Sequence, residues 1–122
     1  MGRKSMKKLL ISTIILTFSG NVLANCENVR GKKYAECIEN NWAKSDANLK
    51  KAFNKAYSET PWYSQPNFSD AQKAWQKYRD AECEYQVSLN SLASHAPTDS
   101  PVQMDQCLTE LNQKRIIELK NN

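Results

Sequence analysis

The chain of 122 residues carries 17 Lys and Arg, 13 Asp and Glu and four cysteines, with a formal net charge of +4. Four of the basic residues precede residue 9, so 13 basic and 13 acidic side chains remain downstream, and that part is close to neutral. The basic excess therefore gives no argument for a nucleic-acid partner or for an anionic membrane surface.

Residues 1–24 have the three parts of an export signal. A basic start is followed by the apolar run Leu9–Phe18 and by the small-residue cleavage site Val22–Ala24. The apolar run is shorter than the roughly 20 residues that a membrane-spanning helix needs, so membrane insertion is not expected. We expect cleavage after Ala24.

The exported part is then residues 25–122, one small helical domain in the periplasm or outside the cell. Cys26 raises the alternative of a lipoprotein, but Asn25 stands where a lipid-attachment motif has Gly or Ala. A domain of this length buries a thin core, for which disulfide bridges are a useful supplement. We therefore expect an exported form without a lipid.

The first predicted helix spans residues 32–58. Its apolar residues recur at three- and four-residue spacing, with a more polar middle around Asn41 and Ser45. The helix ends before Pro61 and Pro66, because each proline lacks an N–H group and disfavours helix in the preceding residue. The apolar positions are Tyr34, Ile38, Trp42, Leu49, Ala52, Phe53, Ala56 and Tyr57.

The proline-containing loop carries Trp62, Tyr63 and Phe68, an unusual set for a connection. The favoured interpretation is that these rings cover the end of the core, because a small domain needs aromatic area. The alternative is a contact surface for a partner, since functional loops often carry such residues. Trp62 and Tyr63 are the candidate partner contact under that alternative.

The second predicted helix begins at about Asp70, because Ser69 and Gln72 have the spacing of a capping box. Its apolar stripe is expected to face the core, which would make this helix the central element of the domain. The stripe comprises Ala71, Ala74, Trp75, Tyr78, Ala81 or Glu82, Tyr85 and Leu89.

The third predicted helix starts at Ser100, an N-cap, with Pro101 in its first turn. Nothing in the chain shows the alternation of a strand, so the predicted fold class is all-α. We expect a three-helix bundle, or a long helical hairpin plus a C-terminal helix, braced by two disulfides. The buried stripe of the third helix comprises Met104, Cys107, Leu108, Leu111, Ile116 and Leu119.

Four cysteines in an exported chain indicate two bridges, with three possible connectivities. Helix geometry disfavours Cys37 with Cys83, whose distances from the inter-helix loop differ by about 10 Å along the helices. Of the other connectivities we favour Cys26 with Cys37 and Cys83 with Cys107. Counting from the start of the third helix to Cys107 then places the end of the second helix near residues 89–91.

Catalytic chemistry has little support in the sequence. With the cysteines expected in bridges, the single histidine, His95, has no nucleophile to activate. Carboxylate pairs such as Asp80 and Glu84 occur at helical spacing, which usually means a solvated face. No C-x-x-C pair accompanies His95, so a metal site is not expected either. We predict no enzymatic activity and no cofactor.

Five residues of the second helix form the pattern Gln-x-x-Trp-x-x-x-Arg-Asp-x-x-Cys, namely Gln72, Trp75, Arg79, Asp80 and Cys83. This pattern resembles the signature of a small secreted bacterial domain, that of the lysozyme inhibitor LprI family. For Arg79 we expect a structural role, with its guanidinium group forked onto a carboxylate or onto helix carbonyls.

The resemblance extends over most of the chain after residue 25. Upstream, Asp46 and Leu49 resemble the Asp-x-x-Leu-Asn part of an element of that family, although Lys50 replaces the Asn. The family's Tyr position holds Phe53, and the closing helix is represented by Cys107, Arg115 and Leu119.

The resemblance implies a protein partner, and the family name implies lysozyme. The leading hypothesis is an exported protein-binding module that inhibits lysozyme-type cell-wall hydrolases. The alternative is an envelope structural or interaction protein whose partner is another bacterial protein or a peptide. A net charge near zero argues mildly against long-range steering to a basic enzyme. The sequence gives no oligomeric state.

Overall fold

A computed structural model of the chain describes residues 22–94 and 100–121. Most of the expected export signal and the loop with His95 lie outside this range. The described residues form three helices and no strand: α1 (Lys32–Glu59), α2 (Gln65–Ser94) and α3 (Ser100–Lys120). The predicted all-α fold with two bridges is confirmed.

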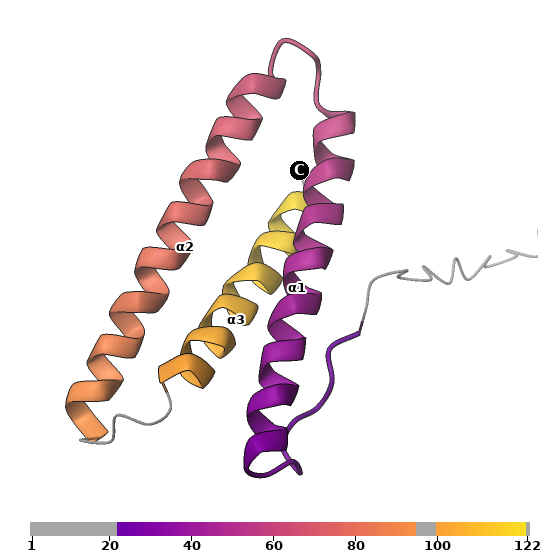
Figure 1. Cartoon of the computed structure of the whole chain (residues 1–122). Helices are drawn as coiled ribbons and strands as arrows, with labels where there is room; N and C mark the ends of the chain where they lie inside the picture. Colours follow the sequence, from indigo (N-terminus) through magenta and orange to yellow (C-terminus); the bar gives the residue numbers. More distant parts are fainter. Residues whose placement is uncertain (1–21, 95–99, 122) are drawn as a thin grey trace, which may run out of the picture.

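The three helices are arranged as an open hairpin with an inserted third helix (Figure 1). α1 and α2 run antiparallel from the turn at residues 60–64 and diverge away from it. α3 lies in the opening and packs on both of them, whereas α1 and α2 contact each other only sparingly. The expectation that the second helix is central is therefore wrong, because α3 fills the space that the hairpin leaves open.

The segment before α1 is held against that helix. A disulfide joins Cys26 to Cys37, with 6.0 Å between their Cα atoms. The side-chain amide of Asn41 donates to the carbonyl of Ala24 and accepts from its N–H group, both at 2.8 Å. Gly31 provides the turn into the helix with a φ of 65°, a conformation that glycine adopts without steric cost.

The start of α2 differs from the prediction. The helix begins at Gln65, not near Asp70, so Ser69 and Gln72 lie inside it and form no capping box. Pro66 is compatible with this start, because a proline in the first turn lacks an N–H group that would have no helical partner anyway. The predicted span of α1, by contrast, agrees to within one residue.

The end of α2 also lies beyond the prediction, at Ser94 in place of residues 89–91. The expected bridge is nevertheless present, with 5.6 Å between the Cα atoms of Cys83 and Cys107. Cys83 is 11 residues before the end of α2 and Cys107 is seven after the start of α3, a difference of about 6 Å along the helices. The counting argument assumed that α3 starts at the same height as the end of α2. It was wrong because α2 continues about one turn beyond that height.

The face of α2 that packs on α3 is not the predicted apolar stripe. Gln72 and Cys83 are buried and Trp75 and Arg79 are half-buried, whereas Tyr78 is 57% exposed. The alternative Glu82 is half-buried, whereas the remaining apolar residues of the stripe, apart from Trp75, are exposed as well: Ala71, Ala74, Ala81, Tyr85 and Leu89. α2 therefore uses a mixed polar face for its packing.

The buried interior is small and strongly polar. Its apolar members, apart from the half-cystines Cys26 and Cys83, are Ile38, Leu49, Leu108 and Leu119. Five buried residues are polar, against six apolar ones when the half-cystines are included: Asn41, Ser45, Gln72, Thr109 and Asn112. The hydrogen bonds that Asn112 and Gln72 form to other helices therefore help to decide how the helices fit together.

A search of the described helices for a long, apolar membrane-spanning segment finds none.

Candidate functional site

The polar interior is centred on Asn112 of α3, whose side chain has no exposed surface. Its amide nitrogen donates to the hydroxyl of Ser45 on α1 at 3.0 Å. Its amide oxygen accepts a hydrogen bond from Nη1 of Arg79 on α2 at 2.9 Å. One amide therefore links all three helices.

Arg79 completes this network with two carboxylates. Nε and Nη2 both contact Oδ1 of Asp80, at 2.9 and 2.8 Å, and Nη1 lies 3.8 Å from Oδ1 of Asp46 on α1. The side chain is only 11% exposed, so its charge needs these partners. The forked geometry is the one that we expected for a structural arginine, although the fork closes on a single oxygen.

Trp75 lies between two arginines at the interface of α2 and α3. The guanidinium carbons of Arg79 and Arg115 are 5.5 and 5.6 Å from the centre of its ring, within the range of cation–π attraction. Arg115 also donates from Nε to the side-chain oxygen of the buried Gln72 at 2.9 Å. Four of the residues that carry the sequence pattern thus share one contact region.

The upstream part of the pattern lies on the α1 side of the same region. Leu49 is buried, and Asp46 is 3.5 Å from the exposed amine of Lys50. Phe53 stacks on Phe68 of α2 with 5.2 Å between ring centres. The residues that carry the family resemblance therefore lie mainly between the helices, which leaves few of them for contact with a partner.

The turn between α1 and α2 presents a different surface. Trp62 is 82% exposed and Tyr63 is 67% exposed, and their rings meet edge to face at 5.9 Å. The favoured expectation that they cover the end of the core is wrong, because Phe68 alone turns inward and stacks on Phe53. We call Trp62 and Tyr63 the aromatic tip.

The backbone beneath the aromatic tip is fixed by short hydrogen bonds. The N–H groups of Thr60 and Ser64 donate to the carbonyls of Tyr57 and Pro61, at 3.1 and 2.8 Å. The side chain of Gln65 donates to the same Tyr57 carbonyl at 3.2 Å. The two rings therefore project from an ordered turn. Below this turn, the stack of Phe53 on Phe68 links α1 to α2.

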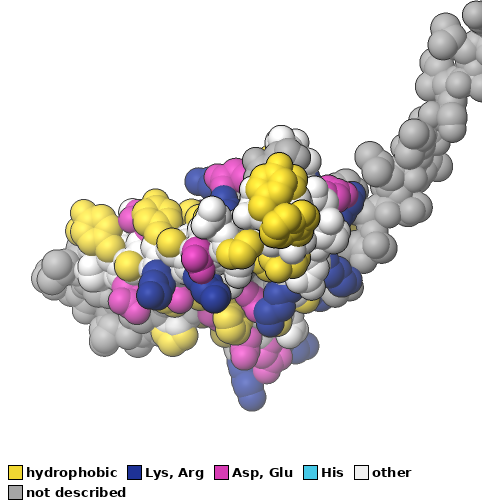
Figure 2. Space-filling model, turned by 90° about the horizontal axis from the view of Figure 1, so that it is seen from above, with side chains coloured by type: hydrophobic (Ala, Val, Ile, Leu, Met, Phe, Trp, Pro, Cys, Tyr) yellow, Lys and Arg dark blue, Asp and Glu magenta, His cyan; other side chains and the backbone are white. Residues whose placement is uncertain are grey.

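Charge around the aromatic tip is mixed. Figure 2 views the molecule from the end that carries the turn and shows exposed hydrophobic side chains among both basic and acidic ones. Exposed residues close in sequence to the turn include Lys55 and Lys73 as well as Glu59 and Asp70. The tip therefore offers a partner apolar area without a field of one sign.

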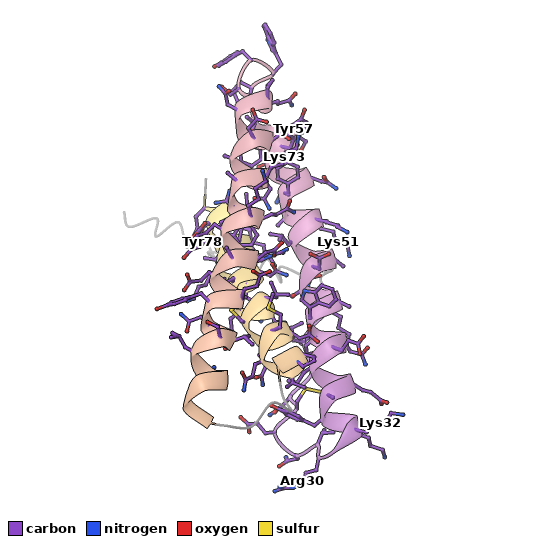
Figure 3. The ribbon with its side chains drawn as sticks, turned by 60° about the vertical axis from the view of Figure 1, so that its left-hand side comes forward. Arg30, Lys32, Lys51, Tyr57, Lys73 and Tyr78 are labelled. Atoms are coloured by element: carbon purple, nitrogen blue, oxygen red, sulfur yellow. A yellow bond between two sulfur atoms is a disulfide. The ribbon has the colours of Figure 1, made fainter. Side chains whose placement is uncertain are left out.

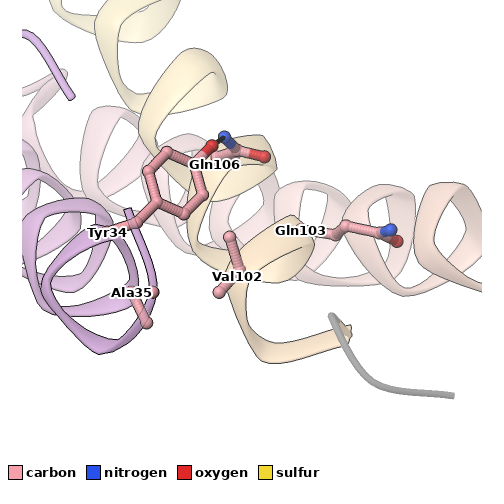
Figure 4. Close-up of a pocket in the computed structure, with 6 residues that line it drawn as sticks. Tyr34, Ala35, Val102, Gln103 and Gln106 are labelled. Atoms are coloured by element: carbon pink, nitrogen blue, oxygen red, sulfur yellow. Dashed lines mark hydrogen bonds between the residues drawn. The ribbon is translucent and has the colours of Figure 1, made fainter. Parts of the chain in front are cut away.

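Two shallow hollows lie between the first halves of α1 and α3. The larger, of about 280 Å³, is lined by Gly31, Tyr34, Ala35, Val102, Gln103 and Gln106 (Figure 4). Gln106 donates from Nε2 to the hydroxyl of Tyr34 at 2.8 Å and also lines the second hollow. Neutral side chains line the larger one, so it has no acid or base for catalysis.

The described residues hold few groups with unusual chemistry. Burial raises the pKa of Asp105 above its ordinary value of 3.8, and the nearby carboxylate of Glu39 raises it further. No group of three or more His, Cys, Asp or Glu in the described chain is placed to hold a metal ion. All four cysteines are in bridges.

Fold, bridges and interior network define a small helical domain with two disulfides and an exposed aromatic turn. The family model described as lysozyme inhibitor LprI matches residues 26–119, so the chain belongs to this family. Searches of curated proteins and of solved structures give no match.

Sequence reasoning missed the polar residues that complete the interior. The apolar pattern of the sequence does not identify Asn112, and it marks Asn41 and Ser45 only as a more polar middle of the first helix. Both lie on the same side as Ile38 and Leu49, at three- or four-residue spacing, and that spacing is a signal that could have identified them.

Proposed function

We propose that this protein is an exported protein-binding module that inhibits lysozyme-type cell-wall hydrolases and catalyses no reaction itself. Membership of the LprI family supports the hydrolase as the partner. The signal-like residues 1–24 and the two bridges support export to the periplasm or the medium.

The observation that carries the proposal is the exposed aromatic tip. Trp and Tyr dominate the binding energy of many interfaces, because they bury a large area with few rotatable bonds. Trp62 and Tyr63 project from a hydrogen-bonded turn, so little conformational freedom is lost on binding. Insertion of this tip into a substrate cleft would block the cleft without chemistry.

An inhibition assay with purified lysozyme and bacterial cell walls tests the proposal. We expect the oxidised protein to inhibit, and Trp62→Ala with Tyr63→Ala to weaken inhibition roughly 30-fold, the equivalent of about 2 kcal/mol. Ile117→Ala, which truncates another exposed apolar side chain on α3, is the control and should inhibit normally. Circular dichroism should show equal helicity for all variants.

Two results would count against the proposal. No inhibition by the wild-type protein at micromolar excess would remove lysozyme as the partner, and full inhibition by the double variant would remove the tip as the contact. The mixed charge around the tip favours a second candidate, an envelope interaction module that binds another bacterial protein or a peptide. If the second candidate is correct, the wild type leaves lysozyme active. In a capture experiment with envelope extract, the wild type then retains proteins that the double variant does not.

A further inference from the structure

The exposed face of α2 has a regular pattern of tyrosine and alanine side chains. Figure 3 shows Tyr78 on the side of α2 that lies away from α1, and 57% of this residue is exposed. Tyr85 is 56% exposed, and the alanines beside the two tyrosines are exposed too. We call this face the outer seam; it comprises Ala71, Ala74, Tyr78, Ala81, Tyr85 and Ser88.

The outer seam has the spacing of a two-stranded coiled coil. Ala71, Tyr78 and Tyr85 are seven residues apart, and a second set, Ala74 and Ala81, follows each of the first two after three residues. Such a heptad pattern keeps one side of a helix facing one partner helix. It extends over about 27 Å of α2, long enough for several layers of contact.

We propose that the outer seam binds a second copy of this chain in an antiparallel, two-fold symmetric dimer. In that direction Tyr78 faces the partner's Ala81, and Tyr85 faces the partner's Ala74. By symmetry Ala81 and Ala74 face these tyrosines, and Ala71 faces the partner's Ser88, so every large side chain meets a small one. A parallel pair would instead place Tyr against Tyr and Ala against Ala, which leaves alternating crowded and empty layers.

The charges beside the outer seam support the same direction. Lys77 directly precedes Tyr78 and Glu84 directly precedes Tyr85, so both flank the seam on one side. Both are exposed, and in the described chain neither lies within 4.0 Å of an opposite charge. In the antiparallel dimer Lys77 lies opposite the partner's Glu84, and the two-fold axis repeats the pair. This complementarity specifies a second copy as the occupant.

Sedimentation velocity of the purified, oxidised exported form tests this dimer from micromolar to millimolar concentration. We expect a reversible monomer–dimer equilibrium. Ala81→Glu should raise the dissociation constant at least about tenfold, because it would bury a carboxylate against the partner's Tyr78. Ala43→Glu, the same change at an exposed alanine of α1, is the matched control and should leave the dimer intact.

A pair of charge changes tests the direction. Lys77→Glu and Glu84→Lys should each weaken self-association, because each places like charges opposite one another, and a mixture of the two variants should restore a dimer. In a parallel pair Lys77 would lie near the partner's Glu82, so Glu84→Lys would have no effect.

Three results would overturn the proposal. The first is a monomeric wild type at millimolar concentration, and the second is an Ala81→Glu dimer as stable as that of the wild type. The third is loss of the dimer in Lys77→Glu but not in Glu84→Lys, which would replace the antiparallel arrangement with a parallel one. Helicity measured by circular dichroism separates these outcomes from misfolding. None of them depends on lysozyme inhibition.

Discussion

Arg79 donates a hydrogen bond from Nη1 to Oδ1 of Asn112 at 2.9 Å, and this contact joins α2 to a fully buried side chain of α3. The other end of the same amide binds Ser45, so its position depends on all three helices. A buried amide of this kind is costly if any partner is lost, because the partner's polar atoms then have neither protein nor water to bind.

Asn112→Ala should therefore lower the free energy of unfolding by about 3 kcal/mol. The change leaves a guanidinium N–H of Arg79 without its acceptor and opens a cavity. Urea unfolding followed by circular dichroism measures this change in the free energy of unfolding. Gln113→Ala, at the exposed neighbouring position of α3, should change the stability by less than about 0.5 kcal/mol.

A double-mutant cycle with Arg79→Met tests whether the two side chains act together. We expect a coupling energy above about 1 kcal/mol, since they share one hydrogen bond in the interior. Additive effects would mean that Arg79 contributes through its other partners, Asp80, Asp46 and Trp75.

Replacement of Cys83 and Cys107 by Ser should lower the free energy of unfolding by about 3 kcal/mol, the value for a bridge that closes a loop of this size. α2 depends on this bridge because it packs on α3 through a largely polar face and contacts α1 sparingly. Urea unfolding of the Ser variant measures the loss. Cys26 and Cys37 close a shorter loop, so their replacement should cost somewhat less, and the reverse order would contradict this account.

Stability should fall as the pH rises from 3.8, to the extent that Asp105 is responsible. Burial and Glu39 raise the pKa of Asp105 in the folded state, so folding favours its protonated form, and that contribution disappears as the pH passes the raised pKa. The stability of the Asp105→Asn variant relative to the wild type should therefore increase from acidic to neutral pH. Unfolding midpoints across this pH range measure the difference in stability between the two proteins. In a Glu39→Gln background this difference should be smaller, because Glu39 no longer raises the pKa of Asp105. A constant difference would contradict the prediction.

The exported form should begin at Asn25 and carry no lipid, because the site at Val22–Ala24 has small residues where cleavage requires them and the residue before Cys26 does not suit lipid attachment. Intact mass measurement decides this. A chain that begins at Cys26 with the added mass of a diacylglyceryl group would contradict it.

The parts of the fold that were predictable depend on local rules. The span of α1 follows from its apolar spacing and from Pro61, and the pairing of Cys83 with Cys107 follows from the antiparallel order of neighbouring helices. The start of α2 was misplaced because Ser69 and Gln72 have capping spacing by coincidence. A proline in the first turn of a helix and a proline in a loop look the same in a sequence.

The buried face of α2 was not predictable from α2 alone. Its aromatic and small residues form a better apolar stripe than Gln72 and Arg79 do, yet the latter face inward. The reason lies on other helices, where Asn112 and Arg115 provide hydrogen-bonding partners. The exposure of Trp62 and Tyr63 was likewise predicted wrongly, since hydrophobicity alone does not say whether a loop aromatic finds a surface to cover.

The polar interior also bears on when this chain folds. An exported protein passes through the cytosol with reduced cysteines, and a core with so few apolar side chains has little hydrophobic drive to collapse there. If residues 1–24 direct export as proposed, we expect the reduced chain to remain largely unfolded and suited to translocation. Formation of the two bridges after the membrane has been crossed would then supply the missing stability, so folding would start only in an oxidising compartment.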